Sequence, residues 1–375
     1  MEVKKGYKQT EFGVIPNDWN FTPINDLYDF QGGSQPPRHT FIFEEKAGYI
    51  RLLQIRDYKT NKYASYIPES LAKRHCKADD IMIGRYGPPI FQILNGLEGA
   101  YNVALIKAIP TVRINKKYGW FILKQEKLFE FVEKLSQRSS GQTGVDLNEL
   151  KNYLIPLPPT KAEQIAIANA LSGADALIAS LEKLIEKKRA IKQGAIQKLL
   201  RPKEGWEVRK LGELLKIRHG RSQKDVEDRS GKYPILGTGG LMGYTNHYLY
   251  DKPSVLIGRK GTIDKPQFLN SPFWTVDTLF YTEINDDVSA KFIYYRFLLI
   301  DWYTHNEASG VPSLNAKTIE NIEISVPKYE EQIRIANLLT DVDDEIKSIE
   351  PKLSKYKMIK KGMMQELLTG KIRLV

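Results

Sequence analysis

Apolar residues recur at alternating steps of three and four in two long stretches of the chain, the spacing of a helix with one apolar seam. In the first stretch the seam positions are Leu171, Ala174, Ile178, Leu181, Ile185, Lys188, Lys192, Ala195 and Leu199. Adding 168 to each number gives the second series, which is Leu339, Val342, Ile346, Ile349, Leu353, Tyr356, Lys360, Met363 and Leu367. Forty residues of helix span roughly 60 Å. Since two matching seams can bury each other, we expect an antiparallel coiled coil.

Both stretches begin with the same motif. The first reads P-T-K-A-E-Q-I-A-I-A-N from Pro159, and the second reads P-K-Y-E-E-Q-I-R-I-A-N from Pro327. The alternative is two ordinary surface helices that happen to be long. That alternative does not explain why residue identity and seam register recur together at one displacement. We therefore interpret the two stretches as a duplication.

Two features interrupt the apolar character of the seam. Lys188, Lys192 and Lys360 occupy seam positions, so the middle of each stretch is expected to be partly polar. Pro351 lies inside the second stretch. An interior proline removes a backbone donor and clashes with the preceding turn, so we expect a kink or break near Ile349.

The sequence ahead of each long stretch is duplicated as well. The segment "IPNDWNFTPINDLYDFQGG" has a similar counterpart, "EGWEVRKLGELLKIRHGRS", 187 residues later. The segment "IMIGRYGPP" has a similar counterpart, "VLIGRKGTI", 174 residues later. Short runs of β-branched and aromatic residues, bounded by Gly and Pro, predict strands. Residues 118–135 and 286–304 are predicted to be helices. Because the displacement falls from 187 to 168, we expect the second globule to be shorter through loop deletions.

These patterns predict an α+β fold in which two globular α/β domains are separated by two long helices, with an internal pseudo-two-fold repeat. The predicted divisions are 1–156 for the first globule, 157–203 for the first helical region, 204–325 for the second globule and 326–375 for the second helical region. The two globules have a similar pattern of strands and helices but different loops. This indicates two domains with the same function and different specificities.

Composition narrows the class of partner. The chain of 375 residues has 56 Lys and Arg against 45 Asp and Glu, a net charge of +11 that favours nucleic acid over a membrane. Hydrophobic residues make up 42%, enough for sizeable cores. The single Cys76 excludes an internal disulfide and fits a reducing cytoplasm. No apolar run of 18 residues or signal peptide is seen, so we expect no membrane span.

The sequence contains no recognisable motif of a DNA-modifying active site, and we predict neither a catalytic residue nor a metal site. No Asn-Pro-Pro-aromatic motif for adenine methylation and no phosphate loop with its lysine occur. The five histidines have no metal-ligand spacing. Cys76 beside His75 could form a nucleophile pair, but adjacent side chains usually point apart. Asp79 and Asp80 could bind magnesium, although a solvated loop before a strand explains them better.

Basic and polar loop residues in both globules are candidates for contacts with DNA. Arg85 and Arg259 each follow an apolar strand in a Gly-Arg-x-Gly turn. Glycines allow close approach to phosphate, and arginine can fork onto phosphate or guanine. The alternative is a structural arginine that ties the turn to the core. The predicted DNA-binding set is Arg38, Gln54, Arg56, Lys59, Arg85, Tyr86, Gln142, Thr143, Arg218, Arg221, Lys224, Arg259 and Lys260.

The doubled motif resembles the specificity subunit of type I restriction-modification systems. The resemblance covers nearly the whole chain and includes "PPTKAEQIAIANAL", "PKYEEQIRIANLL", "YPILGTGGLMGYTN" and "VDTLF". The first copy departs from the pattern at Arg201-Pro202, where the second has Thr369-Gly370. The first globule also lacks the Y-P-x-L-G-x-G-G run. We therefore do not transfer residue roles from one globule to the other.

The resemblance implies a function that fits the residues. Each globule would be a target recognition domain that reads one half of a split sequence in double-stranded DNA. The paired helices would fix the spacer and dock two methyltransferase subunits. Those partners would bind S-adenosylmethionine, and restriction subunits would use ATP and magnesium, so no cofactor is expected in this chain. Two other hypotheses remain open, a scaffold protein and a stand-alone DNA-modifying enzyme.

Overall fold

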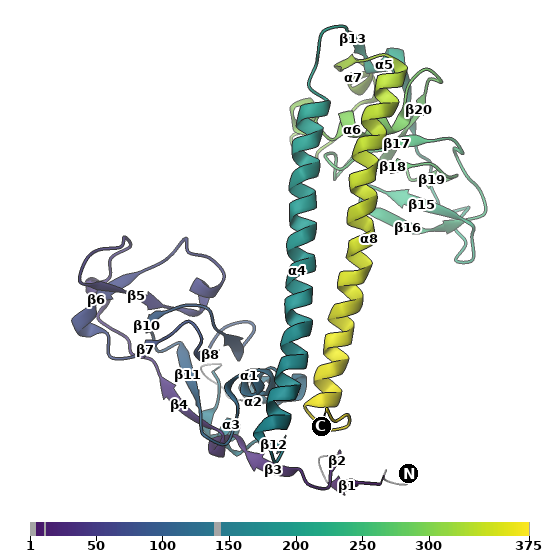
Figure 1. Ribbon diagram of the computed structural model, residues 1–375. Helices are drawn as coiled ribbons and strands as arrows, with labels where there is room; N and C mark the ends of the chain where they lie inside the picture. Colours follow the sequence, from purple (N-terminus) through teal and green to yellow (C-terminus); the bar gives the residue numbers. More distant parts are fainter. Residues whose placement is uncertain (1–4, 11–12, 139–143, 375) are drawn as a thin grey trace. The chain divides into compact units, whose positions relative to one another are not determined.

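The computed structural model describes residues 5–10, 13–138 and 144–374 of the chain. The chain divides into two compact units, which we describe separately. Unit 1 holds residues 1–180 and 353–375, and unit 2 holds residues 181–352. The two long helices, α4 (Lys161–Leu199) and α8 (Tyr329–Leu367), each contribute one part to either unit (Figure 1).

The globule of unit 1 is built on two four-stranded sheets. The first has the order β4-β11-β8-β9, all antiparallel, from Tyr28–Gly32, Leu105–Pro110, Ile81–Gly84 and Gln92–Leu94. The second has the order β6-β5-β10-β7, from Tyr66–Pro68, Tyr49–Leu53, Gly99–Tyr101 and His75–Cys76, with β5 and β10 parallel. Smaller pairs are β1–β2 (Tyr7–Thr10, Gly13–Pro16) and β3–β12 (Asn20–Pro23, Leu154–Leu157). The short helices are α1 (Lys116–Leu123), α2 (Glu126–Arg138) and α3 (Leu147–Asn152).

The globule of unit 2 repeats this plan with fewer strands. Its first sheet has the order β14-β20-β17-β18, from Leu215–His219, Leu279–Ile284, Ser254–Gly258 and Gln267–Leu269. Its second sheet has the order β16-β15-β19, from Gly240–Thr245, Tyr233–Gly237 and Trp274–Thr275, with β15 and β19 parallel. The remaining elements are the pair β13–β21 (Glu207–Lys210, Glu323–Val326) and helices α5 (Leu211–Leu214), α6 (Ala290–Phe297) and α7 (Ala316–Glu320).

The predicted duplication is confirmed by the order of the strands in the main sheets. The order β4-β11-β8-β9 in unit 1 corresponds to β14-β20-β17-β18 in unit 2, and the parallel pair β5–β10 corresponds to β15–β19. Helix α1 corresponds to α6, and α3 corresponds to α7. The long helices have the same length, and their bounds differ by the 168 positions expected from the sequence.

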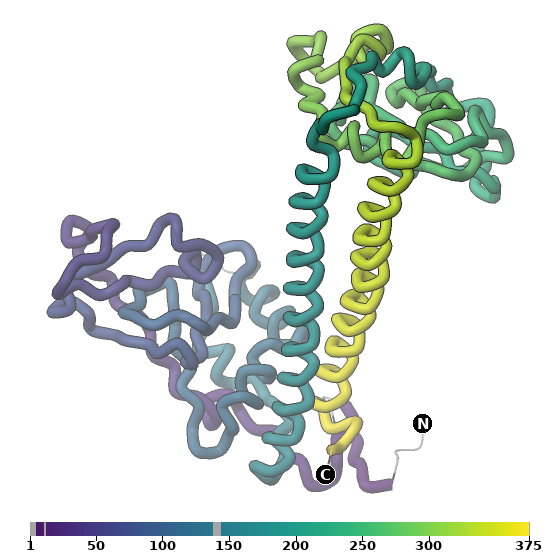
Figure 2. Tube along the Cα trace, turned by 45° about the horizontal axis from the view of Figure 1, so that its top comes forward, coloured from purple at the N-terminus to yellow at the C-terminus, as the bar shows by residue number. Residues whose placement is uncertain are grey.

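The two long helices pair along the predicted seam within each unit (Figures 1 and 2). All eighteen seam positions are buried or half-buried. In unit 1 Lys360 forms an ion pair with Asp175, and in unit 2 Lys192 forms an ion pair with Asp343. Adding 168 to Lys192 and Asp175 gives Lys360 and Asp343, so one contact is present twice. As numbers rise along α4 they fall along α8, which makes the pairing antiparallel.

Each globule packs its core on both long helices. In unit 1 the buried core includes Ile167, Ala168 and Leu171 of α4, Leu367 at the end of α8, and Leu368 directly after it. In unit 2 the corresponding residues are Ile335, Ala336 and Leu339 of α8, Ile196 of α4, and Leu200, which directly follows α4. Burial of such side chains contributes about 1.5–3 kcal/mol each. The helices are therefore part of each folded unit.

A buried glutamine fastens the start of each long helix to its globule. Gln164 accepts a hydrogen bond from the Asn115 backbone N–H at 2.7 Å, and Gln332 accepts one from Ser289 at 2.9 Å. Asn115 and Ser289 are the N-cap residues of α1 and α6. The amide of Gln332 also donates to the Pro327 carbonyl at 3.0 Å. The repeated E-Q motif thus encodes a junction between helix and globule.

Replacing Gln332 with leucine is expected to lower the free energy of unfolding by about 1–3 kcal/mol, because the buried Ser289 N–H loses its partner. Urea denaturation followed by circular dichroism measures the change. Gln193, an exposed glutamine on α4, is the matched control, and its replacement by leucine should have little effect. Equal losses from both substitutions would argue against the junction.

Two helix predictions need correction. Residues 118–135 form two helices, α1 and α2, because the polar residues 124–126 interrupt the apolar series and α1 ends at Leu123. Residues 286–304 do not form one continuous helix. Helix α6 covers only Ala290–Phe297, and a short 3₁₀ turn follows at Trp302–His305. The Trp302 indole donates to the Phe297 carbonyl at 3.0 Å, which folds the chain back after the helix.

The break expected near Ile349 does not occur, since α8 is one uninterrupted helix that contains Pro351. Proline deprives the carbonyl of Lys347 of its usual partner, but Lys347 and Pro351 are both exposed, so water can take that place. Helix α4 is long and apolar enough to cross a membrane by length and composition, with a mean hydropathy of 1.3 over its most apolar 18 residues. One such helix is weak evidence for a membrane span, and α4 pairs with α8 in each unit.

Candidate nucleic-acid interface

The two Gly-Arg-x-Gly turns lie at equivalent strand ends. The Arg85 N–H donates to the Ala104 carbonyl and the Arg259 N–H to the Thr278 carbonyl, both at 2.8 Å. The Arg259 side chain is half-buried and donates to the Asp277 carbonyl at 3.2 Å. The Arg85 guanidinium lies 5.3 Å from the centre of the Tyr86 ring, and its Nε is buried without a hydrogen-bond partner. Both turns therefore hold an arginine on a fixed backbone.

In unit 2 the turn lines a small basic cavity of about 210 Å³. His219, at the end of β14, brings a third basic side chain to Arg259 and Lys260. Ser313 and Asn315 add polar groups, and an isolated backbone β-bridge joins Lys260 to Ser313. Glu307 adds one carboxylate, which accepts a hydrogen bond from the Thr318 hydroxyl. Hydroxyl, amide and guanidinium groups in one cavity are the donors that bind phosphate oxygens.

The loop after β14 carries the other predicted residues of unit 2. Arg218 is exposed and forms an ion pair with Glu283 at 2.8 Å. Arg221 is fixed through its backbone, whose N–H donates to the Thr275 carbonyl at 2.8 Å, while its side chain is exposed. Lys224 is also exposed. The predicted residues therefore occupy one strand end and the loop that follows, with Arg218 held by a carboxylate.

In unit 1 the predicted residues Gln54, Arg56 and Lys59 surround the 3₁₀ turn Ile55–Tyr58. Gln54 is the N-cap of this turn, and its amide donates to the Ser65 hydroxyl at 3.3 Å. The Arg56 guanidinium lies 5.6 Å from the centre of the Tyr63 ring and donates to the Tyr63 carbonyl at 3.4 Å. Arg56 and Lys59 are exposed. Gln54 therefore has a local structural task in addition to any contact with DNA.

The turn Ile55–Tyr58 adjoins the Gly-Arg turn of the same unit. A Cβ atom on Gly84 would lie 3.3 Å from Cδ1 of Ile55, so the end of β8 packs against this turn. The Gly-Arg turn therefore follows directly on a strand end that packs against the turn that carries Arg56. Arg38 is exposed in a separate 3₁₀ turn, Arg38–Thr40. The two predicted residues Gln142 and Thr143 lie outside the described residues.

A family model described as Type I restriction modification DNA specificity domain matches residues 16–192 and again residues 203–355. Together the two matches cover most of the chain. This chain belongs to that specificity-domain family. Its internal repeat is thus a repeat of the family's domain, and each match takes in one globule and most of one long helix.

Curated relatives named as type I specificity subunits are similar to this chain, and a solved structure shares its fold. The type I restriction enzyme MjaVIII specificity subunit of Methanocaldococcus jannaschii is 25% identical over 99% of this chain and 97% of its own length. The type I restriction enzyme EcoprrI specificity subunit of Escherichia coli is 26% identical over 56% of this chain and 57% of its own. The type I S subunit from M. genitalium has the same fold, with a TM-score of 0.69 and 18% identity over 98% of each chain.

Sequence reasoning missed the exposed aromatic and apolar side chains of this specificity-domain protein. Phe43 is 73% exposed in the first globule, and Leu241 and Met242 are 57% and 56% exposed on β16. Tyr63 and Tyr248 are also exposed. Apolar residues inside polar loops are the signal that could have found them. Such side chains can contact thymine methyl groups or stack on bases, which basic residues alone cannot do.

The thiol and acidic pairs considered for chemistry have structural explanations. Cys76 is buried, and burial raises the pKa of its thiol to about 11, so it stays protonated near neutral pH. Asp80 forms an ion pair with Lys107 at 2.6 Å, and Asp79 forms one with Lys116 at 2.7 Å. Within the residues that the structure describes, no group of three or more potential metal ligands occurs.

Proposed function

We propose that this chain is the non-catalytic DNA-recognition subunit of a type I restriction-modification complex. Each globule reads one half of a bipartite target in double-stranded DNA. The observation that supports this most is the double match to the specificity domain, which coincides with two basic turns at equivalent strand ends. Two copies of one fold that differ in their loops suit the recognition of two different half-sites.

The exposed basic residues position the protein on the duplex, and the loop residues select bases. Phosphate contacts contribute most of the affinity but carry no sequence information, so affinity falls steeply as salt rises. Arg259, Lys260 and His219 supply such contacts in unit 2. Bidentate contacts to base edges contribute about 1–3 kcal/mol of discrimination each.

The paired helices set the spacer between the half-sites and dock two methyltransferase subunits. Each unit contains part of the seam and the same ion pair between the two helices, which suits a spacer built from both helices. S-adenosylmethionine is bound by the methyltransferase subunits, which flip and methylate adenine. Restriction subunits bind ATP and magnesium. The complex works in the cytoplasm, where DNA is the substrate and no membrane is involved.

Replacing Arg259 with alanine is expected to weaken DNA binding by the assembled complex about tenfold or more, since a half-buried arginine leaves the basic cavity. Fluorescence anisotropy with a duplex that carries the target measures affinity at several salt concentrations. Arg334→Ala is the matched control, because Arg334 is an exposed arginine of α8 in the same unit. The control should bind as the unchanged complex does.

Unchanged affinity and an unchanged methylation pattern in Arg259→Ala would reject the role of this arginine. The two alternative functions have their own signatures. DNA modification by the purified chain without partners would establish a stand-alone enzyme. An assembled complex that leaves no footprint on DNA at the methylated site would establish a protein scaffold.

A further inference from the structure

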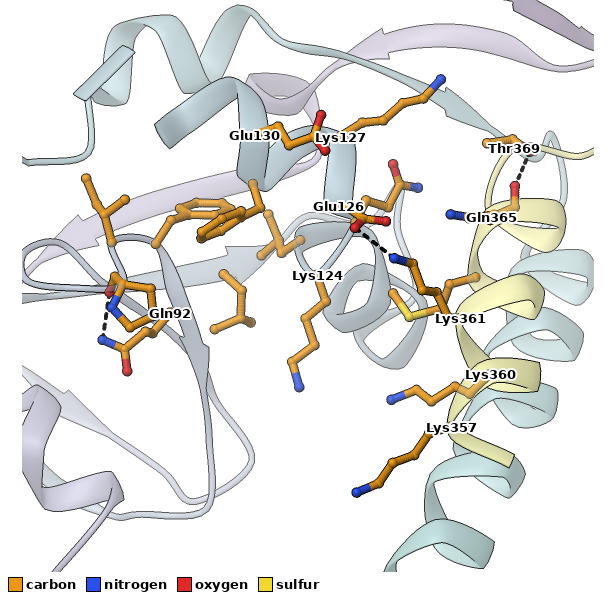
Figure 3. Close-up of a pocket in the computed structure, with 18 of the residues that line it drawn as sticks. Gln92, Lys124, Glu126, Lys127, Glu130, Lys357, Lys360, Lys361, Gln365 and Thr369 are labelled. Carbon is orange, nitrogen blue, oxygen red and sulfur yellow. Dashed lines mark hydrogen bonds and ion pairs between the residues drawn. The ribbon is translucent and has the colours of Figure 1, made fainter. Parts of the chain in front are cut away.

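Unit 1 contains a second cavity, larger than the basic one of unit 2, whose lining includes none of the predicted DNA-binding residues. Its volume is about 810 Å³, within the range of roughly 300–1,000 Å³ typical of small-molecule sites. Three segments line it: the loop 89–93, residues 123–130 of the α1–α2 junction, and one face of α8 from Lys357 to Gln365 (Figure 3). Thr369 and Lys371 complete the wall.

Positive charge dominates the lining. Six lysines line the cavity against two glutamates. The side chains of Lys124, Lys357 and Lys360 extend into the same space from the α1–α2 junction and α8 (Figure 3). Glu126 is engaged by Lys361 at 2.9 Å. Lys360 is engaged by Asp175, and Lys371 by Glu366 at 3.5 Å. Burial and the charge of Lys360 lower the pKa of Lys124, while the Asp175 carboxylate acts in the opposite direction.

The rest of the lining combines apolar side chains with three glutamines and a threonine, and one glutamine has an unsatisfied donor. Ile90, Phe91, Phe129 and Met364 form the apolar part. The Nε2 atom of Gln125 is buried and has no hydrogen-bond partner. A buried donor without a partner is rare in folded proteins and needs an explanation, such as a ligand acceptor. Phe91 also has φ of 59°, a strained conformation that is enriched at ligand sites.

The duplication does not extend to this cavity. Helix α2, which supplies one wall, has no helical counterpart within residues 181–352, where a 3₁₀ turn at Trp302–His305 follows α6 instead. On α4, Arg189 and Gln193 stand at the positions equivalent to Lys357 and Lys361. Arg189 is engaged by Glu350 at 2.7 Å. A feature confined to one repeat is not needed for a task that both repeats share.

We propose that this cavity binds a free nucleoside polyphosphate. The lysines at one end bind the phosphates, the apolar wall holds the base, and the Gln125 amide donates to a ring nitrogen or carbonyl of the base. An aromatic body with hydrogen-bond acceptors and a multiply charged tail matches these three features together. The site is separate from recognition of duplex DNA and gives the subunit one ligand that the second repeat does not bind.

The test uses the purified 375-residue chain and the fluorescent nucleotide N-methylanthraniloyl-ATP. Binding should be saturable, and unlabelled ATP should displace the probe. The double variant Lys124→Gln, Lys357→Gln should lose at least about tenfold in affinity, because two charge-assisted contacts are removed. Gln125→Leu should fold normally and bind several-fold more weakly. Arg189→Gln, the counterpart of Lys357 in the other repeat, should bind as the unchanged chain does.

Competition between the probe and unlabelled compounds distinguishes the possible ligands of the cavity. Adenosine and inorganic tripolyphosphate should each displace the probe far less effectively than ATP. Tripolyphosphate equal to ATP would reduce the cavity to a general anion site and overturn the proposal. Displacement by a single-stranded oligonucleotide but not by ATP would assign the cavity to nucleic acid. Absence of saturable probe binding, or an equal loss of affinity in Arg189→Gln, would also overturn the proposal. Duplex DNA binding is measured in parallel, and normal DNA binding alongside any of these results would leave the proposed function intact.

Discussion

Lengthening both long helices by one turn should lengthen the recognised spacer by one to two base pairs. Four residues inserted after Leu181 in α4 and four after Lys352 in α8 add about 6 Å, against about 3.4 Å for one base-pair step. They also rotate the helix by about 40° beyond a full turn, close to the twist of one base pair. Methylome sequencing of a host that carries the altered chain and its partners reads the new spacer directly.

An insertion in α4 alone is the control for this experiment. It shifts the helices past each other, so the ion pairs Lys360–Asp175 and Lys192–Asp343 cannot both form. The single insertion should therefore lower stability and methylation rather than give a new spacer. A double insertion that folds normally and still recognises the old spacer would refute the role of the helices as a ruler.

Adding one methyl group to Gly220 should lower the free energy of unfolding by about 3 kcal/mol or more. A Cβ atom there would lie 2.0 Å from the Val276 carbonyl oxygen and 2.5 Å from that of Thr275, which are backbone atoms that cannot rotate away. Gly33, its counterpart in unit 1, would place a Cβ 1.9 Å from the Asn102 carbonyl oxygen. Denaturant titration of Gly220→Ala and Gly33→Ala measures both effects.

Each unit offers a control glycine with open space around it. A Cβ on Gly32 or on Gly239 would meet no atom within 4 Å. Gly32→Ala and Gly239→Ala should therefore change stability by less than about 1 kcal/mol. Because Gly220 begins the loop that carries Arg221, Gly220→Ala should also disturb recognition of one half-site. Similar stability for all four variants would contradict the close approach of strand and loop.

The repeat and the helices could be predicted because their signals are local and periodic. A helix of 3.6 residues per turn marks its seam in the sequence, and a shared displacement of 168 marks the duplication. The partner of each charged residue could not be predicted in the same way. Lys192 and Asp343 form an ion pair because the packing of the globules on the helices sets the axial register of α4 against α8. The spacing of apolar residues along one helix does not determine that register.

The site was predictable in its residue types but less so in its assembly. The Gly-Arg turns follow from glycine and strand patterns, and the structure places them at equivalent strand ends. The addition of His219 to Arg259 and Lys260 depends on the pairing of β14 with β20 and of β20 with β17, contacts between residues far apart in sequence. Gln54 resembled a base-reading residue, yet it caps a 3₁₀ turn, because polar side chains in loops satisfy backbone groups as readily as ligands.

Exchange of one globule tests the central claim most directly. Residues 204–325 would be replaced by the corresponding segment of a relative with a different target, and the methylated motif of the host would be mapped by sequencing. If each globule reads its own half-site, one half of the motif changes while the other half and the spacer stay the same. A motif that changes in both halves, or in neither, would contradict the account.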